Sequence, residues 1–134
     1  MKPLDPMSHC PCGSGRSLDN CCGHFLAGLE AAPTAEALMR SRYVAYALGY
    51  DDYVLATWHV STRPCSLELG PEPRPSWIGL SIKRHEQYGE DRAVVEFVAR
   101  YKVGGRAHRM QESSRFVREN DRWFYVDGEV APQP

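Results

Sequence analysis

The four clustered cysteines constrain this chain more than any other feature of its sequence. Cys10, Cys12, Cys21 and Cys22 lie within thirteen residues of one another. Cysteines that are adjacent or one residue apart are poorly placed for unstrained disulfides. The first residues lack the apolar run of a secretory signal, which predicts a reducing, cytoplasmic location. The spacing also differs from the Cys-x-x-Cys of redox pairs, so the cluster indicates a metal site.

The residues between the two cysteine pairs suit a loop that wraps around an ion. Gly13 and Gly15 tolerate positive φ angles, which a tight turn around a metal requires. Ser17 or Asp19 is expected to cap a short helix that carries the second pair. Four soft thiolate ligands predict a closed tetrahedral site of structural type. Zn²⁺ is the first choice of cofactor, and iron is the alternative, because both accept this coordination.

The pattern Cys-Pro-Cys-Gly-Ser-Gly-x5-Cys-Cys-Gly resembles the SEC-C motif, a metal-binding segment of the SecA translocation ATPase and of many small bacterial proteins. By matching positions, the resemblance implies that the ligands are the four cysteines. His9 and His24 are near enough to compete as ligands, but we expect them to be surface residues. Arg16 and Ser17 stand where SecA-type motifs have two lysines, so SecA's partners are not transferred to this chain.

Helical signals follow the cysteine cluster. Thr34 is placed as the N-cap of a helix that Gly49 ends. Asp51 is placed as the cap of a second helix that runs to Trp58. Four prolines between Val60 and Ser76 then predict an irregular crossing.

Four strands are expected in the remainder of the chain. The first strand alternates Ile78, Leu80 and Ile82 on one face, and Gly104-Gly105 marks a hairpin. A second turn is predicted at 119–121, before a final strand. Two helices followed by consecutive antiparallel strands indicate an α+β fold with the helices on one face of the sheet. The first predicted strand begins at residue 77. The other three cover 93–103, 106–118 and 122–127.

This order of elements resembles the nuclear transport factor two-like fold, a cone of helices on a curved sheet. Segments such as Thr57-Trp-His59, Phe97-Val-Ala-Arg100 and Trp123-Phe-Tyr-Val-Asp-Gly128 resemble the bacterial YchJ-type family. The resemblance implies a SEC-C module at 1–30 and a cone-shaped domain at 31–134, with a single metal site. It implies no particular activity.

Cones of the nuclear transport factor two-like fold often enclose a cavity, and some proteins of this fold are isomerases or dehydratases. His59 and Glu112 are the weak candidates for an acid/base pair, because burial raises the pKa of a carboxyl group. The favoured alternative is structural: His59 caps the second helix, and Glu112 pairs with an arginine such as Arg42. Cys65 is expected to be an incidental thiol. The expected pocket residues are Arg42, Trp58, Trp77 and His108.

The leading functional hypothesis is a non-enzymatic adaptor. Its metal module would dock a protein, and its cone would hold a small molecule or peptide. An isomerase or lyase acting in the cone is the alternative. A net charge of −1 and interleaved acidic residues argue against nucleic acid as a partner. No apolar stretch is long enough to predict a membrane span.

Overall fold

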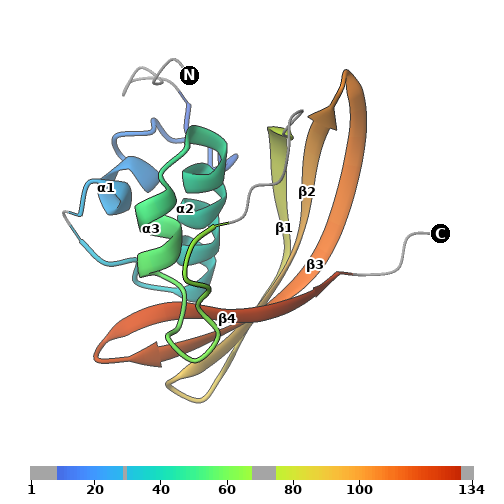
Figure 1. Cartoon of the computed structure of the whole chain (residues 1–134). Coiled ribbons are helices and arrows are strands. Elements are labelled where there is room, and N and C mark those ends of the chain that lie inside the picture. Colours follow the sequence, from blue (N-terminus) through green and yellow to red (C-terminus); the bar gives the residue numbers. More distant parts are fainter. Residues whose placement is uncertain (1–8, 29, 68–74, 131–134) are drawn as a thin grey trace.

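The structure is a computed structural model that describes residues 9–28, 30–67 and 75–130. Three helices precede four strands, as the α+β prediction required. Figure 1 shows the helices gathered on one side of a bent sheet. In chain order the elements are α1 (Cys22–Leu26), α2 (Ala35–Leu48), α3 (Asp51–Ala56), β1 (Ser76–Tyr88), β2 (Arg92–Val103), β3 (Arg106–Glu119) and β4 (Arg122–Val130).

The helix α2 has the ends that the sequence predicted. The Thr34 hydroxyl accepts a hydrogen bond from the Ala37 amide over 3.0 Å, which is the geometry of an N-cap. Gly49 ends the helix in the left-handed conformation, with φ 85°. Two expected caps were wrong. Asp51 is the first residue of α3 rather than its cap, and α1 follows Cys21 without any side-chain cap.

The sheet is a simple antiparallel meander in the order β1-β2-β3-β4. Gly104 and Gly105 turn between β2 and β3 with φ of 58° and 82°, as the hairpin signal predicted. Asn120 and Asp121 also adopt positive φ in the tight turn between β3 and β4. Each strand therefore pairs with its neighbour in the sequence. The helices pack on one face of this sheet (Figure 1).

The first strand differs from its predicted pattern. The register shifts between Trp77 and Gly79, so Ile78 bulges and its side chain is 52% exposed. Trp77, Leu80 and Ile82 pack toward the core instead. A bulge inserts one residue into the alternation, which turns the following side chains to the opposite face.

One continuous core joins the cysteine loop to the rest of the molecule. The cysteines pack in the same buried cluster as Leu38 and Tyr43 of α2 and Phe97 and Phe116 of the sheet. The loop also touches β1 directly, because a Cβ on Gly13 would lie 3.2 Å from the Leu80 carbonyl oxygen. The domain boundary at residue 30 stays a prediction. Buried residues on both sides of it belong to the same core. None of the helices described has the length and apolarity needed to span a bilayer.

Candidate metal centre and cavity

A short turn and the start of α1 bring the four cysteines together. The Gly13 amide donates to the Cys10 carbonyl over 3.2 Å, and Gly13 and Gly15 have φ of 83° and 87°. The Cys10 amide donates to the Arg16 carbonyl over 2.8 Å, which closes the loop. Glycines are required here because the left-handed backbone strains other residues. The loop thereby points its first pair of thiols toward the second pair.

Gly23 allows the second pair to approach the loop. Its amide donates to the Leu18 carbonyl over 2.8 Å. A Cβ at this position would lie 2.6 Å from that carbonyl oxygen, closer than real Cβ atoms come. The glycine that follows Cys22 in the motif therefore has a steric role: it lets α1 begin directly beneath the loop.

The four sulfur atoms have the spacing of a tetrahedral thiolate site. All lie within 4.8 Å of one another, and all four residues are buried. Cys12 Sγ is 3.6 Å from Cys21 Sγ, which is 3.9 Å from Cys22 Sγ. Four thiolates at about 2.3 Å from a zinc ion would stand about 3.8 Å apart. The cysteines are free thiols, so this donor set fits a metal ion without rearrangement.

The close contacts between the thiols shift the pKa values of three of the cysteines. Contacts with the Cys10 and Cys22 thiols hold the pKa of Cys12 far below its ordinary value. The same contact with Cys12 raises the pKa of Cys10 to about 11. Interactions with Cys10 and Cys12, together with burial, also raise the pKa of Cys22. Thiols must be deprotonated to bind a metal, so metal binding at this cluster would release protons.

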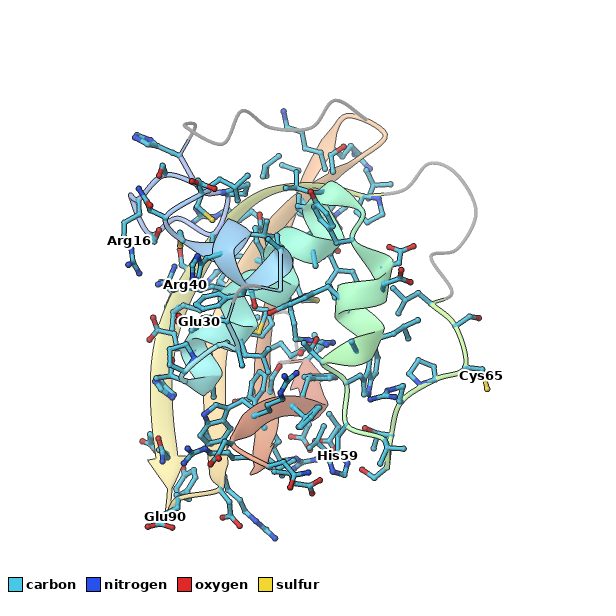
Figure 2. All side chains as sticks on the ribbon, turned by 90° about the vertical axis from the view of Figure 1, so that its left-hand side faces the viewer. Arg16, Glu30, Arg40, His59, Cys65 and Glu90 are labelled. Carbon is cyan, nitrogen blue, oxygen red and sulfur yellow. The ribbon has the colours of Figure 1, made fainter. Side chains whose placement is uncertain are left out.

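Arg40 and Ser14 form an outer layer around the thiols that the sequence did not indicate. Arg40 Nη1 donates to the Cys12 carbonyl over 2.8 Å and lies 3.8 Å from Cys12 Sγ. Glu36 holds the guanidinium from the preceding turn of α2, with Arg40 Nε donating over 3.1 Å. Ser14 Oγ lies 3.1 Å from Cys21 Sγ. Figure 2 shows Arg40 directed at the loop and Arg16 directed away from it. Such outer contacts orient metal ligands.

The two histidines near the motif lie outside the thiol cluster. His24 Nε2 lies 3.5 Å from Glu30 Oε2 at the surface. His9 is exposed and forms an isolated bridge with Ser17. The ligand cluster that the described residues form consists of the four cysteines. Cys65 is an exposed thiol in the loop after α3, well apart from them in Figure 2.

A cavity of about 190 Å³ lies between α2 and the sheet. Arg42, Trp77 and Glu112 line it, as do Tyr46 and Tyr125, which the sequence did not single out. Trp58, His59 and His108 are not among its described lining residues. The others that line it are Met39, Tyr43, Phe97, Ala99, Met110 and Ser114.

The structure does not bring His59 and Glu112 together. His59 Nε2 lies 2.9 Å from Glu119 Oε2, and Nδ1 lies 2.7 Å from Ser61 Oγ. The expected cap of the second helix by the His59 ring was therefore wrong. His108 is exposed and stacks on Tyr101, with ring centroids 5.3 Å apart. The register of β3 directs Glu112 inward, whereas the loop after α3 carries His59 to the outer edge.

The predicted ion pair between Arg42 and Glu112 does not form. Arg42 Nη1 donates to the Val54 carbonyl and to Thr57 Oγ1, each over 2.7 Å. Glu112 Oε2 instead accepts from Ser114 Oγ over 2.6 Å. Among the ion pairs of the described residues, neither side chain has an oppositely charged partner within 4.0 Å. Both charges therefore face the same cavity unpaired.

Comparison with known proteins identifies both parts of the chain. Residues 34–128 match the family model described as the YchJ middle NTF2-like domain. A UPF0225 protein of Chromobacterium violaceum is 61% identical over 127 residues, with 91% of this chain and 93% of that protein covered. A UPF0225 protein of Cupriavidus metallidurans is 54% identical over 127 residues, covering 90% of this chain and 88% of that protein.

Solved structures extend the likeness to the cysteine module. The solution structure of a SEC-C motif-containing protein from Rhodopseudomonas palustris has a TM-score of 0.80 and 35% identity, over 92% of this chain and 98% of that chain. A crystal structure of a SEC-C motif-containing protein from Psychrobacter arcticus shares the fold, with a TM-score of 0.76 and 24% identity, over 96% and 86% of the two chains. The chain therefore belongs to the YchJ-type UPF0225 family, which joins a SEC-C motif to an NTF2-like domain.

Proposed function

We propose that this protein is a metal-stabilised adaptor whose cysteine module docks a protein partner. The four buried thiols leave no open coordination position for substrate, so the ion would have a structural role. Zn²⁺ is the proposed ion, because four thiolates with tetrahedral spacing suit it and it brings no redox chemistry. Free thiols persist in a reducing compartment, so we place the protein in the cytoplasm.

An apolar cleft beside the module carries the docking proposal. The cleft has a volume of about 340 Å³ and lies between the module and the end of the sheet. Phe25 and Leu26 of α1 form one wall, and Trp123 and Phe124 of β4 form another. The metal would hold α1 in place and thereby keep this cleft open for an apolar segment of a partner, in the manner of helix or peptide grooves.

Metal analysis of the purified protein tests the identity of the ion. We expect one equivalent of zinc in protein expressed without added metal, and none in the Cys21→Ser variant. One equivalent of iron with a thiolate charge-transfer spectrum would contradict the zinc assignment and leave the thiol site itself supported.

Affinity capture with matched surface variants tests the docking surface. Leu26→Asp places a charge in the cleft, whereas Val60→Asp places one on an exposed residue of the loop after α3. We expect partners recovered by the wild type to be lost with Leu26→Asp and with Cys21→Ser, and retained with Val60→Asp. Recovery of the same partners by all four proteins would show that the module is not the docking surface.

A second candidate function rests on the cavity. Unpaired Arg42 and Glu112 in an aromatic enclosure support binding of a small molecule there. The isomerase or lyase alternative loses its proposed partner for Glu112, because His59 is paired with Glu119 and is not among the described residues that line the cavity. The cavity is accordingly proposed as a binding site for a small molecule.

A further inference from the structure

The guanidinium of Arg42 is buried at the cavity between α2 and the sheet, and no carboxylate of the described residues pairs with it. Arg42 is 3% exposed, and its guanidinium lies 4.5 Å from the Tyr125 ring centroid and 5.3 Å from that of Trp58. Both of its hydrogen bonds use Nη1. Among the described residues, Nε and Nη2 have no acceptor. Arginine keeps its proton even when buried. The Nε and Nη2 groups of Arg42 are therefore suited to an anionic or carbonyl acceptor.

The opposite wall of the cavity provides a carboxylate. Glu112 projects from β3, and its only described hydrogen-bond donor is Ser114 Oγ, which binds Oε2 over 2.6 Å. Gly128 on the neighbouring strand makes room for this carboxylate, because a Cβ there would lie 2.6 Å from Glu112 Oε2. One carboxylate oxygen thus has no described protein partner. A half-buried carboxylate in this state favours a cationic or donor group.

The size and walls of the cavity limit what can satisfy both charges. Its volume of about 190 Å³ is somewhat larger than the roughly 150 Å³ engineered cavity that takes up benzene. Tyr43, Tyr46, Trp77 and Phe97 contribute aromatic surface, which attracts ammonium groups through the negative faces of the rings. A simple amine would leave Arg42 unpaired, and a simple acid would leave Glu112 unpaired. The first case leaves a buried guanidinium without a counter-charge, and the second leaves a half-buried carboxylate without one.

We propose that the cavity binds a small zwitterion of the amino-acid class. Its carboxylate would meet the free edge of Arg42, and its ammonium group would meet Glu112 and the aromatic rings. The proposal rests on the proposed role of the cavity as a small-molecule site, and it names the chemistry of the ligand.

Calorimetric titration of the full-length, metal-loaded protein tests the proposal. The probes are L-alanine, L-leucine and L-phenylalanine, the amine and the carboxylic acid that correspond to each, and toluene as a neutral apolar probe. We expect at least one amino acid to bind ten-fold or more tightly than both of its one-charge counterparts. Equal or tighter binding of the amine or the acid would overturn the zwitterion assignment.

Variants separate charge recognition from loss of the fold. Glu112→Gln should weaken binding of the amino acid ten-fold or more and leave its acid counterpart unaffected, whereas Glu90→Gln, in the turn after β1, serves as the matched control. Gly128→Ala keeps every charge but displaces the Glu112 carboxylate, so it should weaken the same ligand. Arg42 also donates a hydrogen bond to the Val54 carbonyl of α3. Its substitution could disturb the fold, so the test relies on the Glu112 and Gly128 variants.

The failure of this proposal is distinguishable from the failure of the cavity as a binding site. Binding of toluene or of a one-charge probe without a preference for amino acids would overturn the zwitterion and support the site. If no probe bound at all, both proposals would be overturned.

Discussion

The guanidinium of Arg40 reaches from α2 into the cysteine loop and donates to the carbonyl oxygen of Cys12 over 2.8 Å. Glu36 fixes the same guanidinium from one helical turn earlier. The helix that packs on the sheet thus also supports the backbone at one cysteine of the candidate metal site.

Replacement of Arg40 by alanine should weaken metal binding without removing a ligand. The variant leaves the Cys12 carbonyl without its donor and the thiolate without a nearby positive charge, so we expect zinc affinity to fall by about 10- to 100-fold. Competition with a chromophoric chelator measures this change. Arg16→Ala is the control, because Arg16 is exposed. Equal affinities of the two variants would show that Arg40 has no influence on the site.

Removal of the metal should disorder the cysteine module while the sheet persists. A segment of this size has little core of its own without an ion. Because the cysteines share a core with α2 and the sheet, we also expect a lower melting temperature for the remainder. Chelation followed by circular dichroism and thermal unfolding measures both effects. Loss of the strand signal at 25 °C on chelation would contradict the prediction that the sheet stays folded without the metal.

Gly23→Ala should destabilise the protein although alanine is the better helix former. The added Cβ would meet the Leu18 carbonyl oxygen at 2.6 Å, and neither atom can easily move, because the oxygen belongs to the backbone and the Cβ is fixed rigidly to it. We expect a loss of about 1–3 kcal/mol in the free energy of unfolding. Gly79→Ala is the control, because its nearest neighbour lies 3.9 Å away. Denaturant unfolding measures the free energy of unfolding of both variants. Equal values for the two would contradict the steric role of Gly23.

Stability should fall at alkaline pH through Tyr125. Burial raises the pKa of its hydroxyl from 10.0 to about 12. The unfolded chain therefore loses this proton first, so the contribution is complete below pH 10 and declines as the pH rises to about 12. Tyr125→Phe keeps the ring over Arg42 but cannot ionise, so its free energy of unfolding should depend less steeply on pH in this window. Identical pH dependence of wild type and variant would contradict this assignment.

Local signals predicted the order of the elements and the ends of α2. Thr34 and Gly49 act within a few residues of themselves, through a capping hydrogen bond and a left-handed backbone. The Gly104-Gly105 hairpin is equally local. The cysteine site belongs with them, since its ligands fall in one short loop whose spacing indicates a tetrahedron.

Long-range relations were not accessible in the same way. Arg40 supports Cys12 from 28 residues away, and its only signal was the spacing to Glu36 on one helix face. The pairing of charges in the cavity was also predicted incorrectly. Arg42 turns to the end of α3, and Glu112 turns to Ser114, because each finds a hydrogen-bonding partner nearer than the other.

The α+β class, the order of the elements and the clustering of the four cysteines could be read from the sequence, because capping, turn geometry and close cysteine spacing act between residues near one another in the chain. The tertiary structure decided which side chains share a space. A bulge at Ile78 turned that side chain outward, and the loop after α3 placed His59 against Glu119, away from Glu112. These outcomes depend on strand register and on packing between distant segments, and alternation along a single strand carries no record of either.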